Sequence, residues 1–175
     1  MIEVAPQLYV GDQNDYVRLS KSIGLRFAKE WAVVHACKEP HHREALGYTG
    51  RAAPKEHPEY LFARRDNRLM LNLVDVDGPA YVAKEIIDAA LAFIAAHLAQ
   101  NKKVLVHCNQ GKSRSPIIAV LYLAPTLSTD SMIAEAQFTH TYPHYSPARG
   151  MRDFALANWD HYARQHFALD TRITV

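Results

Sequence analysis

Residues 104–115 read VLVHCNQGKSRS, and this stretch decides the fold. A short apolar strand leads into a polar turn, which is followed by Pro116 and an apolar run from Ile117 to Leu123. Proline is favoured just inside the start of a helix, where its missing N–H costs nothing. Converging backbone N–H groups and the positive end of a helix dipole attract anions. The stretch therefore predicts a strand, an anion-binding loop and the N-terminus of a helix.

Four residues of this loop suit phosphate chemistry. Gly111 allows a backbone turn that other residues resist. Arg114 offers a planar fork of donors that fits two phosphate oxygens, and the five residues between it and Cys108 are enough to wrap one tetrahedral anion. Such positive surroundings lower the pKa of a thiol from about 8.5 to roughly 3.5–7.5, so we expect Cys108 to be a thiolate nucleophile. Ser115 is placed to donate a hydrogen bond to the sulfur.

The string His-Cys-x-x-Gly-x-Ser-Arg-Ser at 107–115 resembles the signature of the cysteine-dependent protein tyrosine phosphatase superfamily, and its form with Pro116 is most similar to the compact dual-specificity phosphatases. The resemblance implies a metal-free phosphomonoester hydrolase that forms a phosphocysteine intermediate, with no cofactor. It implies that Cys108 attacks phosphorus, Arg114 binds phosphate oxygens and Ser115 steadies the departing sulfur. It also implies that the loop positions between them contact the substrate: Asn109, Gln110, Gly111, Lys112 and Ser113. His107 is expected to hydrogen-bond the loop backbone.

Two aspartates before the helix expected at Ala80 to Gln100 are candidates for a general acid. Phosphate-ester cleavage needs a proton for the leaving oxygen, and a carboxylic acid on a loop can supply it. Asp77 lies 31 residues before Cys108, a spacing similar to that of the family's acid, and Asp75 lies 33 residues before it. We expect Asp77 to be the acid, with Asp75 as the alternative. The remaining interpretation is that Asp77 only caps the following helix.

The substrate expected from the resemblance is a protein that carries phosphotyrosine and phosphoserine or phosphothreonine. One alternative is a phosphoinositide or a phosphorylated small molecule. Lys112 would suit a lipid phosphate, but Asn109 stands where lipid phosphatases of the superfamily carry a second basic residue. Another alternative, of a different class, is a phosphate-binding module without turnover.

Length and composition agree with one domain over residues 1–175. The formal charge of +2 is too small to predict a nucleic-acid partner, and no apolar run approaches the length of a membrane span. Two cysteines do not make a disulfide framework, and the N-terminus lacks the features of a signal peptide, so we expect a cytoplasmic protein. The oligomeric state is not predicted.

The expected fold is α/β: a single domain with a mostly parallel central sheet flanked by helices, and the phosphatase loop between the central strand and the next helix. Strands are predicted at 8–11, 31–37, 60–63, 69–74 and 104–107. Helices are predicted at 80–100, from 117 to near Pro125, at 130–142, and from the turn at 145–151 to about 168. Residues 38–59 are predicted to form a long surface loop. If the sheet is parallel, this loop leaves the same edge as the Cys108 loop, so His41, His42 and Arg43 are candidate pocket-wall residues.

The histidines and Cys37 are candidates for further chemistry. The histidines at 35, 41, 42 and 57 show no ligand spacing typical of a metal site, so none is predicted. Cys37 ends an apolar strand next to the expected central strand. We consider two interpretations of Cys37: an inert core thiol, or a thiol that traps oxidised Cys108 as a reversible disulfide.

Overall fold

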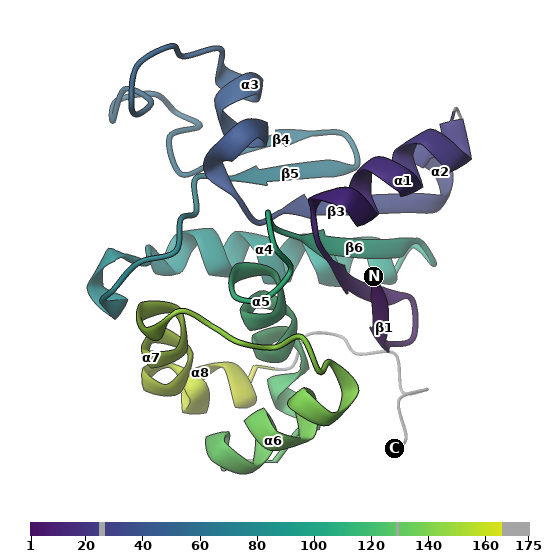
Figure 1. The fold of residues 1–175 in the computed structure, drawn as a ribbon, viewed down its shortest axis with the longest axis vertical. Helices are drawn as coiled ribbons and strands as arrows, with labels where there is room; N and C mark the ends of the chain where they lie inside the picture. The colour runs from purple at the N-terminus through teal and green to yellow at the C-terminus, as the bar shows by residue number, and fades with distance from the viewer. Residues whose placement is uncertain (25–26, 129, 166–175) are drawn as a thin grey trace.

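The computed structural model describes residues 1–24, 27–128 and 130–165, and its centre is a six-stranded sheet with the order β1-β2-β6-β3-β5-β4 (Figure 1). β2, β6, β3 and β5 run parallel, while β1 and β4 pair antiparallel at the two edges. The strands are β1 (Ile2–Ala5), β2 (Leu8–Gly11), β3 (Trp31–His35), β4 (Phe62–Arg65), β5 (Arg68–Leu71) and β6 (Lys103–His107). The predicted α/β fold with a mostly parallel sheet is confirmed.

Helices cover both faces of the sheet, with α1 and α2 on one side and α4 to α8 on the other (Figure 1). Alternate residues of the central strands serve the two faces: Val33 and Leu105 pack with Leu19 of α1, whereas Val34 and Val106 belong to the larger core beneath α4 and α5. The longer helices are α1 (Gln13–Ile23), α4 (Lys84–Leu98), α5 (Arg114–Leu123), α6 (Ser131–Thr141) and α7 (Arg149–Ala157), and the short ones are α2 (Phe27–Glu30), α3 (Arg43–Leu46) and α8 (Trp159–Ala163).

β6 is central because it is apolar on both faces. It pairs with β2 on one side and β3 on the other, and its residues from Val104 to His107 are buried. Strands covered on both faces read as continuous apolar runs, as this one does. α5 follows at once, and all ten of its residues are buried. The strand, loop and helix predicted from residues 104–123 are therefore the middle of the molecule.

Three segments differ from the sequence-based expectation. β1 was not predicted, and it pairs with β2 through a turn in which Gln7 adopts a φ of 64°. The predicted loop 38–59 begins with two helical pieces, η2 (Lys38–His42) and α3, in which Arg43 pairs with Glu39 one turn away. The last predicted helix is divided into α7 and α8 at Asn158, whose backbone N–H and side-chain amide both donate to the carbonyl of Phe154. The predicted end of that helix, at residues 166–168, lies outside the described residues.

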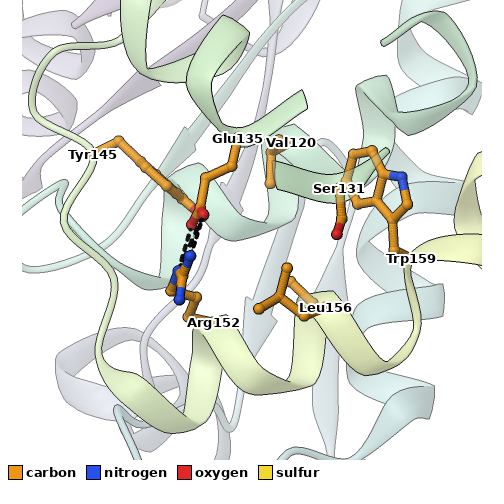
Figure 2. Close-up of a pocket in the computed structure, with 8 residues that line it drawn as sticks. Val120, Ser131, Glu135, Tyr145, Arg152, Leu156 and Trp159 are labelled. Atoms are coloured by element: carbon orange, nitrogen blue, oxygen red, sulfur yellow. Dashed lines mark hydrogen bonds and ion pairs between the residues drawn. The ribbon is translucent and has the colours of Figure 1, made fainter. Parts of the chain in front are cut away.

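The layer formed by α6 and α7 is held by a partly buried polar contact (Figure 2). Arg152 donates from Nη2 to Glu135 at 2.6 Å, and the Tyr145 hydroxyl donates to the same carboxylate at 3.1 Å. The hydrogen bond from Arg152 lowers the pKa of Glu135. The pocket that these residues line with Trp159 encloses about 10 Å³, roughly the space of one water molecule, so it is a packing gap.

Across residues 1–24, 27–128 and 130–165, no single helix has the length and apolarity needed to cross a membrane. One bent pair passes that test together, Arg114–Thr126 with Ser131–Thr141. α5, the first part of this pair, is buried in the core.

Gly150 ties α7 to the segment that follows β5. Its N–H donates to the carbonyl of Val76 at 3.0 Å. A Cβ at this position would lie 2.4 Å from Val76 O and 2.7 Å from Gly78 N, both of them backbone atoms. The close approach therefore requires glycine, and it fixes the position of the chain on either side of Val76.

We predict that Gly150→Ala destabilises the protein by about 1–3 kcal/mol, because the new methyl group would overlap backbone atoms that cannot move aside cheaply. Urea unfolding measures the change. Gly50→Ala is the matched control, since the nearest atom to its Cβ would be 3.9 Å away, and it should stay within about 0.5 kcal/mol of wild type. Equal unfolding midpoints for the two variants would contradict the packing described for Gly150.

Candidate active site

The Cys108 loop (residues 108–113) connects β6 to α5 and places a buried thiol at the helix N-terminus. The Ser115 hydroxyl lies 3.2 Å from Cys108 Sγ and 3.2 Å from the carbonyl oxygen of Gly11. A hydroxyl has one proton, so Ser115 can donate to the sulfur or to the carbonyl but not to both. The Ser115 hydroxyl is therefore positioned beside the sulfur even when it donates to the Gly11 carbonyl.

Gly111 gives the loop its shape. Its φ is +69°, in the left-handed region that favours glycine, and a Cβ there would lie 3.0 Å from the Gly11 carbonyl group. The Tyr142 hydroxyl donates to the Gly111 carbonyl at 2.7 Å. β2 and the end of α6 thus hold the turn from outside.

Arg114 is almost fully buried, and each side of its guanidinium has a protein partner. Nη1 donates to the Leu73 carbonyl at 3.3 Å, and Nη2 donates to Asn109 Oδ1 at 2.9 Å. Nε forms an ion pair with Asp75, at 3.0 Å from Oδ2. The cation is therefore held at the rim of the loop where an oxyanion would bind.

Asp75 links the loop to its surroundings. Its Oδ1 accepts a 2.6 Å hydrogen bond from Ser113 Oγ, which in turn accepts from the N–H of Ala148 before α7. Asp77 is exposed, and within the described part of the chain it makes no hydrogen bond or ion pair. The two aspartates thus differ: Asp75 is bonded to the loop and to Arg114, whereas Asp77 is free to approach a ligand from solvent.

The predicted substrate-binding positions differ in exposure. Asn109, Gln110 and Lys112 are exposed at the mouth of the loop, while Gly111 and Ser113 are buried. Gln110 and Lys112 also line a neighbouring cavity of about 390 Å³. The remaining lining residues come from the N-terminal strands, α1 and the end of α6: Met1, Ile2, Asp12, Asp15, Arg18, Tyr142 and His144.

The segment from Lys38 to Leu46 approaches the Cys108 loop through its backbone: Asn109 Nδ2 donates to the Glu39 carbonyl at 3.0 Å. Of the three candidate pocket-wall residues, Arg43 is bonded to the Glu39 carboxylate and His42 is buried, with Nε2 3.0 Å from the Glu59 carbonyl. His41 turns inward instead. Its Nε2 lies 2.8 Å from Gln13 Oε1.

Three histidines meet behind the Cys108 loop, and we call His35, His41 and His107 the histidine cluster. His35 Nδ1 lies 2.7 Å from His107 Nε2, and the rings of His35 and His41 are 3.9 Å apart between centroids. Burial lowers the pKa of His107 to about 3 and that of His41 to about 4, and it lowers the pKa of His35 well below its usual value. The three rings are therefore neutral at pH 7. The backbone of Cys108 contacts the His107 ring and acts to raise its pKa, which is the loop contact expected for this histidine, although burial outweighs it. The buried Nδ1 of His107 falls short of a full hydrogen bond in this contact.

Cys37 lies next to the loop, one residue after the bond from the Ala36 N–H to the His107 carbonyl. It is a free thiol with no exposed surface, and burial raises its pKa to about 12. Cys37 is therefore a protonated thiol, in contrast to the nucleophile expected at Cys108. Whether it ever pairs with Cys108 stays a prediction.

Two features of the site were not predicted from the sequence. The histidine cluster draws one residue each from β3, η2 and β6, so no spacing along the chain reveals it. One sequence feature could have predicted the contact of His35 with His107: each stands at the end of an apolar strand, and parallel pairing of these strands brings the two together. No sequence feature predicted the ion pair of Asp75 with Arg114, because both aspartates lie at similar sequence distances before Cys108.

Comparisons with known proteins agree with this geometry. The family model for the catalytic domain of dual specificity phosphatases matches residues 52–151. Among solved structures, the chain is similar to DUSP15 (TM-score 0.64, 19% identity, covering 94% of this chain and 90% of that one) and to human DUSP28 (0.60, 19%, 94% and 95%). It is also similar to the human tyrosine phosphatase-like serine/threonine/tyrosine-interacting protein (0.53, 20%, 96% and 95%). No curated protein matches. The Cys108 loop with its strand and helix is the centre of a fold shared with these proteins, and the chain belongs to the dual specificity phosphatase family.

Proposed function

We propose that this protein hydrolyses phosphomonoesters on phosphorylated proteins through a phosphocysteine intermediate. The observation that carries the proposal is the placement of Cys108 Sγ at the base of the loop, 3.2 Å from the Ser115 hydroxyl, with Arg114 at the opposite end of the same loop. A nucleophile, an anion-binding backbone and a fixed cation surround one space. Phosphoryl transfer requires positioning and charge stabilisation of this kind.

In the first step the Cys108 thiolate attacks phosphorus, and a sulfur–phosphorus bond forms as the bond to the leaving oxygen breaks. The loop N–H groups and Arg114 stabilise the negative charge on the equatorial oxygens. Arg114 can take a phosphate oxygen in place of Asn109 Oδ1 while its Nε remains paired with Asp75. Asp77 protonates the leaving oxygen, so that an alcohol or phenol departs rather than its anion.

In the second step water attacks the phosphocysteine. The Asp77 carboxylate, left ionised by the first step, accepts a proton from the water as the sulfur–phosphorus bond breaks. The departing thiolate receives the hydrogen bond of Ser115, whose alternative acceptor is the Gly11 carbonyl. Inorganic phosphate leaves and the starting state is restored.

The contacts of the two aspartates support the assignment of Asp77 as the acid. Asp75 is engaged by Arg114 and by Ser113, and transferring its proton in each turnover would interrupt the ion pair that positions Arg114. Within the described residues Asp77 makes no such hydrogen bond or ion pair, and it is exposed to an incoming substrate. Asp75 is therefore assigned as a positioning residue for Arg114 and Asp77 as the catalytic acid.

The charge around the loop supports a protein substrate rather than a phosphoinositide. The neighbouring cavity has Lys112, Arg18 and His144, but also the carboxylates of Asp12 and Asp15. A headgroup with several phosphates is recognised by converging cations, and these carboxylates would repel it. The two free cysteines also suit a reducing compartment, so we propose that the protein acts in the cytoplasm.

A phosphate-binding module is the second candidate, because one structural neighbour is described as a phosphatase-like interacting protein. Such a module would need Arg114 and the loop N–H groups. It would have no use for a nucleophile at Cys108 with a hydrogen-bond donor at Ser115, or for an exposed acid at Asp77. Turnover therefore separates the two functions.

We predict that Cys108→Ser reduces hydrolysis of p-nitrophenyl phosphate to the uncatalysed rate, since a serine hydroxyl is a far weaker nucleophile at pH 7 than a thiolate. Cys37→Ser, the same change at the other cysteine, should retain turnover. Calorimetric binding of a phosphopeptide should survive in Cys108→Ser because Arg114 is untouched. Hydrolysis by Cys108→Ser at the wild-type rate would refute the nucleophile, and wild-type binding without hydrolysis would favour the module.

Substrates with different leaving groups distinguish the roles of the two aspartates. We expect Asp77→Asn to lower kcat by about 10²–10⁴ on phosphoserine peptides, whose alkoxide must be protonated, and by less on p-nitrophenyl phosphate, whose phenolate leaves unaided. Asp75→Asn should instead raise KM about tenfold on both substrates, equal to about 1.4 kcal/mol of binding lost when Arg114 is released. If the dependence on the leaving group appears in Asp75→Asn instead, the two roles are exchanged.

A substrate panel tests the class of substrate. We expect phosphotyrosine and phosphoserine or phosphothreonine peptides to have values of kcat/KM at least about tenfold above those of phosphoinositides and nucleotides, which is about 1.4 kcal/mol of transition-state binding. The Cys108→Ser variant serves as the blank for each compound. A higher kcat/KM for a phosphoinositide would overturn the assignment to protein substrates while leaving the chemistry at Cys108 intact.

A further inference from the structure

The histidine cluster has the composition and spacing of a metal site. His35, His41 and His107 each offer one ring nitrogen, and these three atoms lie within 4.8 Å of one another. His35 and His107 are opposite one another on the paired strands β3 and β6, and His41 reaches them from η2. Two of the three are on the sheet, which is the most rigid part of the fold, so their separation is set by strand pairing.

The hydrogen bonds of the cluster leave ring nitrogens available as ligands. An amide oxygen only accepts, so His41 donates from Nε2 to Gln13 Oε1, and its Nδ1 carries a lone pair. Histidines that bind metals commonly donate their other N–H to an oxygen of the protein in this way. His35 Nδ1 and His107 Nε2 share one proton at 2.7 Å. A metal ion can bind both nitrogens once the ring that donates this proton carries it on its other nitrogen, so that both rings stay neutral.

The distances need only a small adjustment. Ligand nitrogens at 2.0–2.1 Å from a tetrahedral Zn²⁺ are about 3.3 Å apart, so the pair at 2.7 Å must separate slightly. A cavity of about 210 Å³ lined by His35 and His41 gives access to the cluster and room for a fourth ligand. Glu44 and Arg68 also line this cavity, so a water molecule or a small anion near Arg68 can complete the coordination.

We propose that His35, His41 and His107 form a binding site for one divalent transition-metal ion of the Zn²⁺ class. Imidazole nitrogens select zinc, copper, iron or nickel over magnesium and calcium, which prefer oxygen ligands. The site is separate from the phosphate-binding loop, because its ligands lie behind the strand end that carries Cys108. Since His107 directly precedes Cys108, a bound ion would add positive charge behind the nucleophile. The proposal does not depend on the phosphatase mechanism.

The test is direct metal binding by untagged, chelator-treated protein. Zn²⁺ is titrated in competition with a chromophoric chelator, and Co²⁺ is added separately so that its visible absorption reports tetrahedral nitrogen coordination. We expect one tight site per chain. His41→Gln should weaken Zn²⁺ binding by more than about 100-fold, and Gln13→Ala, which removes only the partner of His41, by about 10- to 100-fold. His140→Gln, the same change at an exposed histidine on α6, is the matched control and should bind as wild type does.

Cys108→Ser decides between this site and the other metal-binding group nearby, the Cys108 thiolate. The proposal requires that Cys108→Ser retain the wild-type affinity and the Co²⁺ spectrum. Loss of binding in Cys108→Ser, with retention in His41→Gln and Gln13→Ala, would place the ion on the sulfur and overturn the proposal. Wild-type protein that binds no Zn²⁺ in competition with the chelator would also overturn it. Thermal unfolding of each variant tests whether that variant is folded. If His41→Gln does not fold, the zinc affinity of Gln13→Ala decides.

Discussion

Arg114 and Asp75 form an ion pair with 3.0 Å between Nε and Oδ2, and the rest of the site is arranged around it. Arg114 is the first residue of α5, directly after the Cys108 loop, while Asp75 lies in the segment that follows β5. The pair therefore joins two stretches of chain that are almost forty residues apart, and it fixes the guanidinium before any phosphate arrives. An arginine that is already ordered loses little further freedom when it binds an anion, which favours binding.

The ion pair also determines where the acid can be. Asp75 is held by Ser113 and Arg114, and Val76 is held by Gly150 at the start of α7. Asp77 follows two anchored residues and is exposed. Its backbone is therefore held on both sides, by the bond of Gly150 to Val76 and by the close approach of Gly150 to Gly78. A carboxyl group that has to approach a leaving group and then a water molecule benefits from this arrangement, because its backbone is fixed while no bond within the described residues holds its side chain.

The fold was largely predictable from the sequence, and the site was predictable in its chemistry but not in its connections. Residues 104–123 specify a buried strand, a glycine turn and a buried helix, because each step has a strong local signal: an apolar run, Gly111 and Pro116. The splitting of the last helix at Asn158 and the helical turns within residues 38–46 depend on particular side-chain bonds, to Phe154 and between Arg43 and Glu39, which periodicity does not reveal. The ion pair of Arg114 with Asp75 was not predicted, and the general acid was left open between Asp75 and Asp77, since only tertiary structure distinguishes neighbours two residues apart.

Parallel strand pairing has a consequence on both sides of Cys108. At its front it delivers the loop to the helix N-terminus, and at its back it sets His107 against His35, with Tyr16 stacked on the His107 ring at 4.9 Å between centroids. The imidazoles there are neutral because burial opposes their protonation, so the three rings themselves add no positive charge behind the sulfur in this state. On the front side lies the cation of Arg114, which is itself neutralised in part by Asp75. An ion bound by the three rings would change that balance without touching the substrate, because it acts through the strand end from which the nucleophile projects.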